Sequence, residues 1–430
     1  MIALQSDKKL DLVSLASIPL IMTLGNSMLI PILPEMERKL KIGSFEVSMM
    51  ITVYSVVAIL LIPVAGYMSD RVGRKKIIIP SLIITGIGGL ISGASAWFIK
   101  DSYWFILAGR LLQGVGASGA FPIVLPLVGD MFKRDDDVSQ GLGIIETANT
   151  VGKVLSPILG AALAVLIWYL PFLSIPVFSV VSIILVAWLV KVPKTPDQEN
   201  VRFHTFLASL KELFAQKGRW LFAIFAIGGI IMFVIFGSMF YLSSELEDVF
   251  HIHGVVKGLI LAIPLLALSL ASFMTGKHIE DNKTRMKWLS FIGSAVLTAA
   301  ITVGATVDNI YLLLSSLLVG GVGIGLVLPC LDAFITSGIE KKERGTVTSL
   351  YSSVRFIGVA AGPPAVSLLS KVSHQAVFYT ISGLCAVSAV LSLFAIKPGT
   401  PKQTSGRSKQ MQSVPAFGHK KSMNPNRPKA

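Results

Sequence analysis

The chain has 430 residues, of which 53% are hydrophobic and only 14% are charged. Soluble proteins carry about 25% charged residues, so this composition excludes an ordinary soluble protein and indicates a membrane protein. The formal net charge of +14 does not indicate a nucleic-acid partner, because the basic residues fall in loops and tails beside apolar runs and not on one folded face; that distribution suits anionic lipid.

Twelve apolar runs follow one another along the chain, each close to or above the length of about 20 residues that a helix needs to cross a bilayer. They predict an all-α membrane protein with twelve transmembrane helices. The first run is too long for a signal-peptide core and has no small-residue cleavage pattern. The runs cover residues 12–33, 47–68, 77–98, 104–128, 142–163, 166–190, 220–243, 258–275, 288–307, 311–334, 347–369 and 377–396.

Hydrophilic segments divide the chain into two halves of six spans each. We expect an N-terminal tail at residues 1–11, a first bundle at 12–190, a linker at 191–219 and a second bundle at 220–396. The linker has room for a surface helix around residues 203–216. Residues 397–430 are rich in Pro, Ser and Lys, so we expect a disordered basic tail.

The basic residues are distributed unevenly between the two sides of the predicted membrane. With both termini on one side, 29 of the 38 Lys and Arg residues lie in tails and loops on that side, and three lie within spans. The positive-inside rule therefore predicts that both termini lie on the cytoplasmic side of the cell membrane. The six basic residues left for the external loops are Arg38, Lys39, Lys41, Lys100, Lys257 and Lys371.

The two halves repeat short motifs at matching positions. A Gly-Val-Gly triplet precedes a proline at the same spacing in the fourth span (Gly114 to Pro122) and in the tenth (Gly321 to Pro329). Many secondary transporters are built from repeated units, with the substrate site between the halves near the membrane midplane.

A basic hairpin with the sequence GYMSDRVGRKK, residues 66–76, joins the second and third spans. Gly66 and Gly73 allow close helix approach and a tight reversal. The pattern that includes Asp70, Arg71 and Arg74 resembles the loop signature of the major facilitator superfamily. The resemblance covers about residues 10–397 and implies two six-helix bundles related by pseudo-two-fold symmetry, that is, a transporter and not an enzyme.

The same resemblance implies that Asp70 and Arg74, with Asp130 at the end of the fourth span, form a cytoplasmic charge cluster that acts as a conformational switch. The Asp70 carboxylate would cap the eleventh helix near residues 345–348 and stabilise the outward-facing state. The alternative is a charge run that only sets the topology.

Arg110 and Gln113 belong to a segment of the fourth span that resembles the superfamily motif R-x-x-x-G-x-G. An arginine inside an apolar span costs about 2.5–3.5 kcal/mol on insertion scales, so it should face a polar cavity or a carboxylate. By resemblance, Arg110 would hold or gate a proton. The alternative is a structural clamp on backbone carbonyls.

The fifth span carries Glu146, Asn149 and Lys153, which share one helical face. We expect this face to line the cavity, with Glu146 as the proton carrier; the alternative is a static Glu146–Lys153 ion pair. In the second half, Arg355 is the one charge expected to be well buried, and Asp332 is expected near a cytoplasmic helix end.

Small residues in the fifth span resemble the antiporter signature of the superfamily, with two glycines replaced by Ser156 and Ala161. They predict a close, kinked helix interface, which we expect to face the eighth span. The departures from the signature weaken the inference to antiport. The interface set is Gly152, Ser156, Pro157 and Gly160, with Gly362 and Pro363 as counterparts in the eleventh span.

The resemblance points to the twelve-span drug:proton antiporters. No phosphate-binding loop pattern occurs, so an ion gradient would supply the work, with no other cofactor and no metal site. Three cations against one carboxylate inside the spans favour a neutral aromatic or anionic cargo. The chain is thus expected to be a proton-coupled exporter of small aromatic molecules, functional as a monomer. A dedicated exporter of a self-made metabolite such as a catecholate siderophore, a proton-symport importer, and a receptor or scramblase remain alternatives.

Overall fold

The computed structural model describes residues 6–132, 135–191, 203–279, 282–306, 309–339 and 341–396. All of them belong to one compact unit, Met1–Lys397. The tail expected at residues 397–430 and residues 192–202 of the linker lie outside the described residues. Within the described ranges, twelve helical segments are long and apolar enough to cross a membrane.

The first half contains six spans, four of which each consist of a single helix. The elements in chain order are α1 (Ser6–Ser27), η1 (Ile30–Ile32), α2 (Leu33–Leu40), α3 (Ser44–Val72), α4 (Arg74–Phe98), α5 (Tyr103–Ser118), α6 (Phe121–Met131), α7 (Asp135–Leu166) and α8 (Leu170–Leu189).

The second half is more regular, with one helix for each span. Its elements are α9 (Phe203–Asp248), α10 (Gly254–His278), α11 (Lys283–Gly304), α12 (Ile310–Gly338), α13 (Lys341–Ser370) and α14 (His374–Phe394). Helix α9 begins at Phe203, so the helix expected around residues 203–216 is continuous with the seventh span.

Prolines interrupt the first and fourth spans. Pro31 and Pro34 lack the N–H that an α-helix requires, and the first span continues there as η1 and α2. The fourth span stops at Ser118 and restarts as α6, with Pro122 in its first turn. Helix α12 passes through the equivalent Pro329 without a break, so the repeat in sequence is not an exact repeat in shape.

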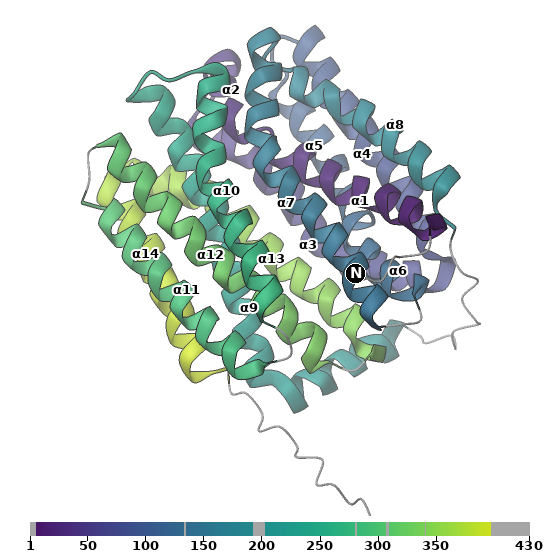
Figure 1. Ribbon diagram of the computed structural model, residues 1–430. Coiled ribbons are helices and arrows are strands. Elements are labelled where there is room, and N and C mark those ends of the chain that lie inside the picture. The colour runs from purple at the N-terminus through teal and green to yellow at the C-terminus, as the bar shows by residue number, and fades with distance from the viewer. Residues whose placement is uncertain are drawn as a thin grey trace, which may run out of the picture. The chain divides into compact units, whose positions relative to one another are not determined.

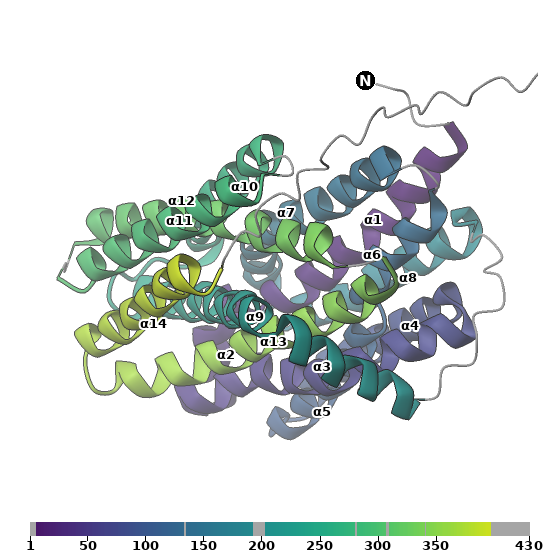
Figure 2. The ribbon, with the colours of Figure 1, turned by 90° about the horizontal axis from the view of Figure 1, so that it is seen from below.

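The two halves pack in the same internal order. In the first half α3 and α4 pack on α5, α1 packs on α7, and α4 packs on α8; in the second half α10 and α11 pack on α12, α9 on α13, and α11 on α14. The halves meet where α3 packs on α13 and α7 on α10. Figures 1 and 2 show these four helices between the two bundles.

The glycines of the fifth span contact a different neighbour from the one expected. A Cβ at Gly160 would lie 2.1 Å from the carbonyl oxygen of Met28, which follows α1, and one at Gly152 would meet Leu20 and Thr23 of α1. The close approach to the eighth span comes from Gly258 of α10, which lies against Pro157 of α7. The reason is that α7 packs on both α1 and α10 and uses different faces for them.

The second half repeats the glycine-mediated contact. Gly358 and Gly362 of α13 lie against the backbone of α9 at Gly229 and Phe233. Because α13 and α9 correspond to α7 and α1, the small residues predicted as matching sets do perform matching packing roles. Pro363 lies inside α13.

Candidate transport cavity

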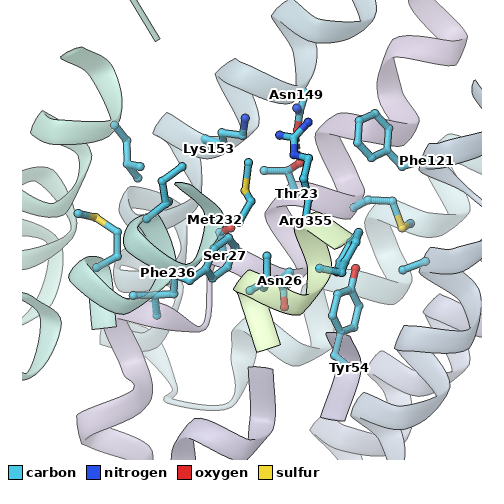
Figure 3. Close-up of a pocket in the computed structure, with 18 of the residues that line it drawn as sticks. Thr23, Asn26, Ser27, Tyr54, Phe121, Asn149, Lys153, Met232, Phe236 and Arg355 are labelled. Atoms are coloured by element: carbon cyan, nitrogen blue, oxygen red, sulfur yellow. Dashed lines mark hydrogen bonds between the residues drawn. The ribbon is translucent and has the colours of Figure 1, made fainter. Parts of the chain in front are cut away.

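A cavity lies between the two halves, with a volume of about 1080 Å³ when the space at its mouth is included. Its walls come from α1, α3, α5, α6 and α7 in the first half and from α9, α10 and α13 in the second. Most of the lining is apolar, with methionine and aromatic side chains such as Phe121, Met232 and Phe236 (Figure 3). Such a surface suits an aromatic cargo.

Two cations line the cavity, one from each half. Lys153 comes from α7 and Arg355 from α13, and Figure 3 shows both side chains in the part of the cavity where Asn149 lies. Lys153 Nζ lies 3.9 Å from Glu146 Oε1, and Arg355 Nη1 lies 3.7 Å from Asp332 Oδ1. Each cavity cation therefore has a carboxylate partner from its own half.

Glu146, Asn149 and Lys153 do share one face of α7, as their spacing predicts. Asn149 Nδ2 donates to both carboxylate oxygens of Glu146, and Asn149 Oδ1 accepts a 2.7 Å hydrogen bond from Thr23 of α1. Asn149 and Lys153 line the cavity, whereas Glu146 is not among its lining residues and has a side chain that is 44% exposed. The amide of Asn149 is thus fully engaged with protein groups.

Asp332 was not among the site residues expected from the sequence. It lies in α12, two turns before the helix ends, and pairs with Arg355 beside the cavity. Arg355 also lies over the ring of Tyr351, 5.5 Å from its centroid. A charged aspartate inside an apolar run is the feature of the sequence that could have marked Asp332 as a site residue. Helical spacing could not reveal its partner, because Arg355 is on another helix.

Arg110 does not line the cavity. It is 0% exposed, and its guanidinium donates to the carbonyls of Met50 (2.8 Å) and Gly25 (3.3 Å), to Asn26 Oδ1 (2.7 Å) and to Gln113 Oε1. It also lies 4.5 Å from the ring centroid of Tyr54. These partners are neutral, which matches the alternative of a structural clamp; Asn26 and Tyr54, however, line the cavity.

The basic hairpin forms the predicted ion-pair cluster. Arg74 Nη1 lies 2.9 Å from Asp70 Oδ1, and Arg74 Nε donates to Asp130 of α6. Gly73 reverses the chain with φ 108°, a conformation that side chains disfavour. Arg71 donates to Tyr67, and Gly66 lies against Ser349 of α13. Because α13 begins at Lys341, residues 345–348 lie within the helix and not at its first free amides.

The opposite end of the molecule, which we call the α2 end, joins the halves by polar contacts. Arg38 of α2 pairs with Glu247 of α9, and Lys257 of α10 donates to the same carboxylate at 2.5 Å. Ser44 and Ser367 share a 2.8 Å hydrogen bond. Lys257 and Glu247 are 1% and 5% exposed, so Lys257 is buried and does not lie in an open external loop as the sequence suggested. The expectation that Arg355 is the one well-buried charge of the second half is therefore wrong: its side chain is 21% exposed, whereas Lys257 and Glu247 are buried.

Two bundles of six spans around a shared, mostly apolar cavity that holds two cations are typical of a multi-pass membrane transporter. The family model described as Major Facilitator Superfamily matches residues 15–363 and 237–425. The chain therefore belongs to the major facilitator superfamily.

Two relatives of this chain are named for export or efflux. It is 52% identical over 388 residues to the "Bacillibactin exporter" of Bacillus subtilis (strain 168), covering 90% of this chain and 96% of the relative. It is 25% identical over 382 residues to the "Multidrug efflux protein YfmO" of the same organism, covering 86% and 89%.

Solved structures share the fold at low sequence identity. The human organic anion transporter MFSD10 (TETRAN) superimposes with a TM-score of 0.72 at 20% identity, over 90% of this chain and all of that one. A bacterial homologue of the human lysosomal transporter Spinster gives 0.69 at 14% identity, over 92% and 96%. These similarities confirm the fold predicted from the repeated spans.

Proposed function

We propose that this protein exports a siderophore of the catecholate class across the cell membrane. The observation that carries the proposal is the 52% identity over nearly the full length of a relative named as a bacillibactin exporter; bacillibactin is a catecholate siderophore. The multidrug relative is half as similar. The metabolite-export alternative is therefore better supported than the broad drug range that the sequence motifs favoured.

The cavity supports an anionic aromatic cargo, but for a reason different from the excess of cations in the spans. Counting Asp332, the charges beside the cavity balance, because Glu146 and Asp332 partner Lys153 and Arg355. The positive and negative groups differ in position, because the two cations line the cavity and their carboxylate partners do not. Deprotonated catechol oxygens would contact Lys153 and Arg355, with the rings against Phe121 and Phe236.

Proton coupling follows from the same charges. With both carboxylates ionised, the empty site is neutral; an anionic cargo makes it negative, and a proton on Glu146 or Asp332 makes the empty site positive. A membrane potential that is negative inside drives the loaded site outward and pulls the protonated empty site inward, at up to about 2.3 kcal/mol per charge for 100 mV. Exchange of cargo for a proton would thus use the potential in both directions.

The conformation fits one step of this cycle. The positive-inside count puts the α2 end outside and the Gly73 hairpin in the cytoplasm. The Arg38–Glu247 and Ser44–Ser367 contacts join the two halves at the α2 end, which supports a state that is closed to the outside and loads from the cytoplasm.

Two experiments test the proposal. A deletion strain grown without iron should accumulate catecholate inside the cell and secrete less than its parent, and the wild-type gene should restore secretion. Proteoliposomes with an imposed pH gradient and potassium-diffusion potential should move a catecholate probe outward against its gradient. Uptake in the direction of the proton gradient would indicate an importer. Intact function of the Lys153→Ala/Arg355→Ala variant would indicate a non-transporting role.

A further inference from the structure

Two asparagines line the cavity, and the structure treats them differently. Asn149 has its oxygen and its nitrogen both engaged, by Thr23 and by Glu146. Asn26 has its Oδ1 engaged by Arg110 Nη2 at 2.7 Å, while no described residue accepts a hydrogen bond from its Nδ2. Of the two asparagines, Asn26 is therefore the one with an amide N–H left for a cargo.

The orientation of the Asn26 amide is fixed by chemistry. An amide oxygen and nitrogen are hard to distinguish by shape alone, but a guanidinium has only donors. A flipped Asn26 would direct its own N–H groups at those of Arg110, deep in a buried site where lost hydrogen bonds are costly. Arg110 is itself held by two backbone carbonyls and Gln113, so it cannot turn to accommodate the flip.

We propose that Asn26 is a specificity-determining hydrogen-bond donor to the cargo, and that Arg110 is the positioning residue that keeps the Asn26 amide nitrogen facing the cavity. The inference deepens the proposed function and rests on its cargo site. Lys153 and Arg355 also present donors to the cavity. A cavity with three fixed donor groups selects cargo rich in acceptor oxygens, such as catecholate, carboxylate and amide carbonyl groups.

This role explains a buried arginine without a carboxylate partner. An arginine inside the membrane normally faces a carboxylate or water, and Arg110 instead donates to neutral oxygens. Its effect on the cargo passes through one atom pair, Arg110 Nη2 and Asn26 Oδ1. Asn26→Asp keeps a partner for Arg110 but replaces the donor with an acceptor, which should repel acceptor oxygens of the cargo.

The test measures export kinetics in proteoliposomes with N-(2,3-dihydroxybenzoyl)glycine as the probe. Asn26→Ala should raise KM about tenfold, the value of one hydrogen bond to a charged group, with turnover at saturation little changed. Asn26→Asp should raise KM further. Arg110→Gln should raise KM to a similar extent, and adding Asn26→Ala to it should have little further effect, because both changes remove the same donor.

Several outcomes would overturn the inference. An unchanged KM in Asn26→Ala would show that Asn26 does not contact the cargo. Fully additive effects in the Arg110→Gln/Asn26→Ala double variant would show that Arg110 does not act through Asn26. If Arg110→Gln fails to fold, the two Asn26 variants decide alone. If the wild type exports neutral chloramphenicol and not the catecholate probe, the proposed function is wrong; the KM for chloramphenicol, which also carries acceptor oxygens, then reports on Asn26.

Discussion

Arg38 and Glu247 form an ion pair that joins the two halves at the α2 end. Arg38 belongs to the short helix that ends the first span, and Glu247 to the last turn of the seventh. The Glu247 carboxylate is shared with Lys257 of the same half. Opening the α2 end must therefore separate Glu247 from Arg38, whereas the Glu247–Lys257 pair can stay intact.

Arg38→Ala should shift the protein toward the state that is open at the α2 end. The measurement is a disulfide between Ser44→Cys and Ser367→Cys, whose hydroxyl oxygens are 2.8 Å apart in the closed state. Oxidation should cross-link this pair and stop export, and reduction should restore it. Adding Arg38→Ala should slow cross-linking by roughly twofold to fivefold, since a partly exposed ion pair contributes about 0.2–1 kcal/mol. Equal cross-linking rates with and without Arg38 would show that the pair does not hold this end closed.

Glu247→Ala should have a much larger effect on stability than Arg38→Ala. It leaves the ammonium of Lys257, 1% exposed, without its carboxylate, and breaking a buried pair from one side costs about 3–5 kcal/mol. The Glu247→Ala/Lys257→Met double variant removes both charges and should recover most of the loss. Thermal unfolding in detergent measures the stability of the Arg38→Ala, Glu247→Ala and Glu247→Ala/Lys257→Met variants. A double variant as unstable as the single one would contradict the pairing.

Glu146→Gln and Asp332→Asn should each bind anionic cargo more tightly and transport it more slowly. Neutralising either carboxylate frees its cavity cation, Lys153 or Arg355, for the cargo. We expect KM to fall by roughly twofold to fivefold, the range for partly exposed pairs, while turnover falls because one of the two carboxylates can no longer carry a proton. Lys153→Gln should change KM in the opposite direction. A higher KM in both carboxylate variants would indicate that these groups bind the cargo directly.

The sequence predicted the helices well because each span is a continuous apolar run, and length alone identifies it. It predicted the one-face cluster of Glu146, Asn149 and Lys153 because those residues share a helix, so their geometry depends only on helical spacing.

The sequence could not show which charges pair between helices. Lys257 and Glu247 lie at the ends of two spans, where hydropathy assigns them to a solvent-exposed loop. The packing of α9 against α10 and α2 instead leaves them buried. Asp332 lies within a predicted span, but its partner Arg355 is on another helix, so helical spacing does not reveal the pair. Nor could the sequence decide which neighbour a glycine approaches, because α7 has one glycine-bearing face against α1 and a second close contact with α10.

Gly160 and Gly383 offer a matched test of close helix packing. An added Cβ at Gly160 would lie 2.1 Å from the Met28 carbonyl oxygen, a backbone atom that cannot rotate away, whereas one at Gly383 of α14 meets nothing within 4 Å. Gly160→Ala should therefore push α7 away from the first span and destabilise the protein by about 1–3 kcal/mol, as over-packing does.

Gly383→Ala should be neutral or stabilise the protein by up to about 1 kcal/mol, because alanine loses less backbone entropy in a helix than glycine. Thermal unfolding in detergent gives the comparison, and export rates in proteoliposomes show whether the α1–α7 spacing also affects the cavity, since Thr23 and Asn149 bond across the same helix pair. If both variants unfold at the same temperature as the wild type, the two helices are not in backbone contact at Gly160.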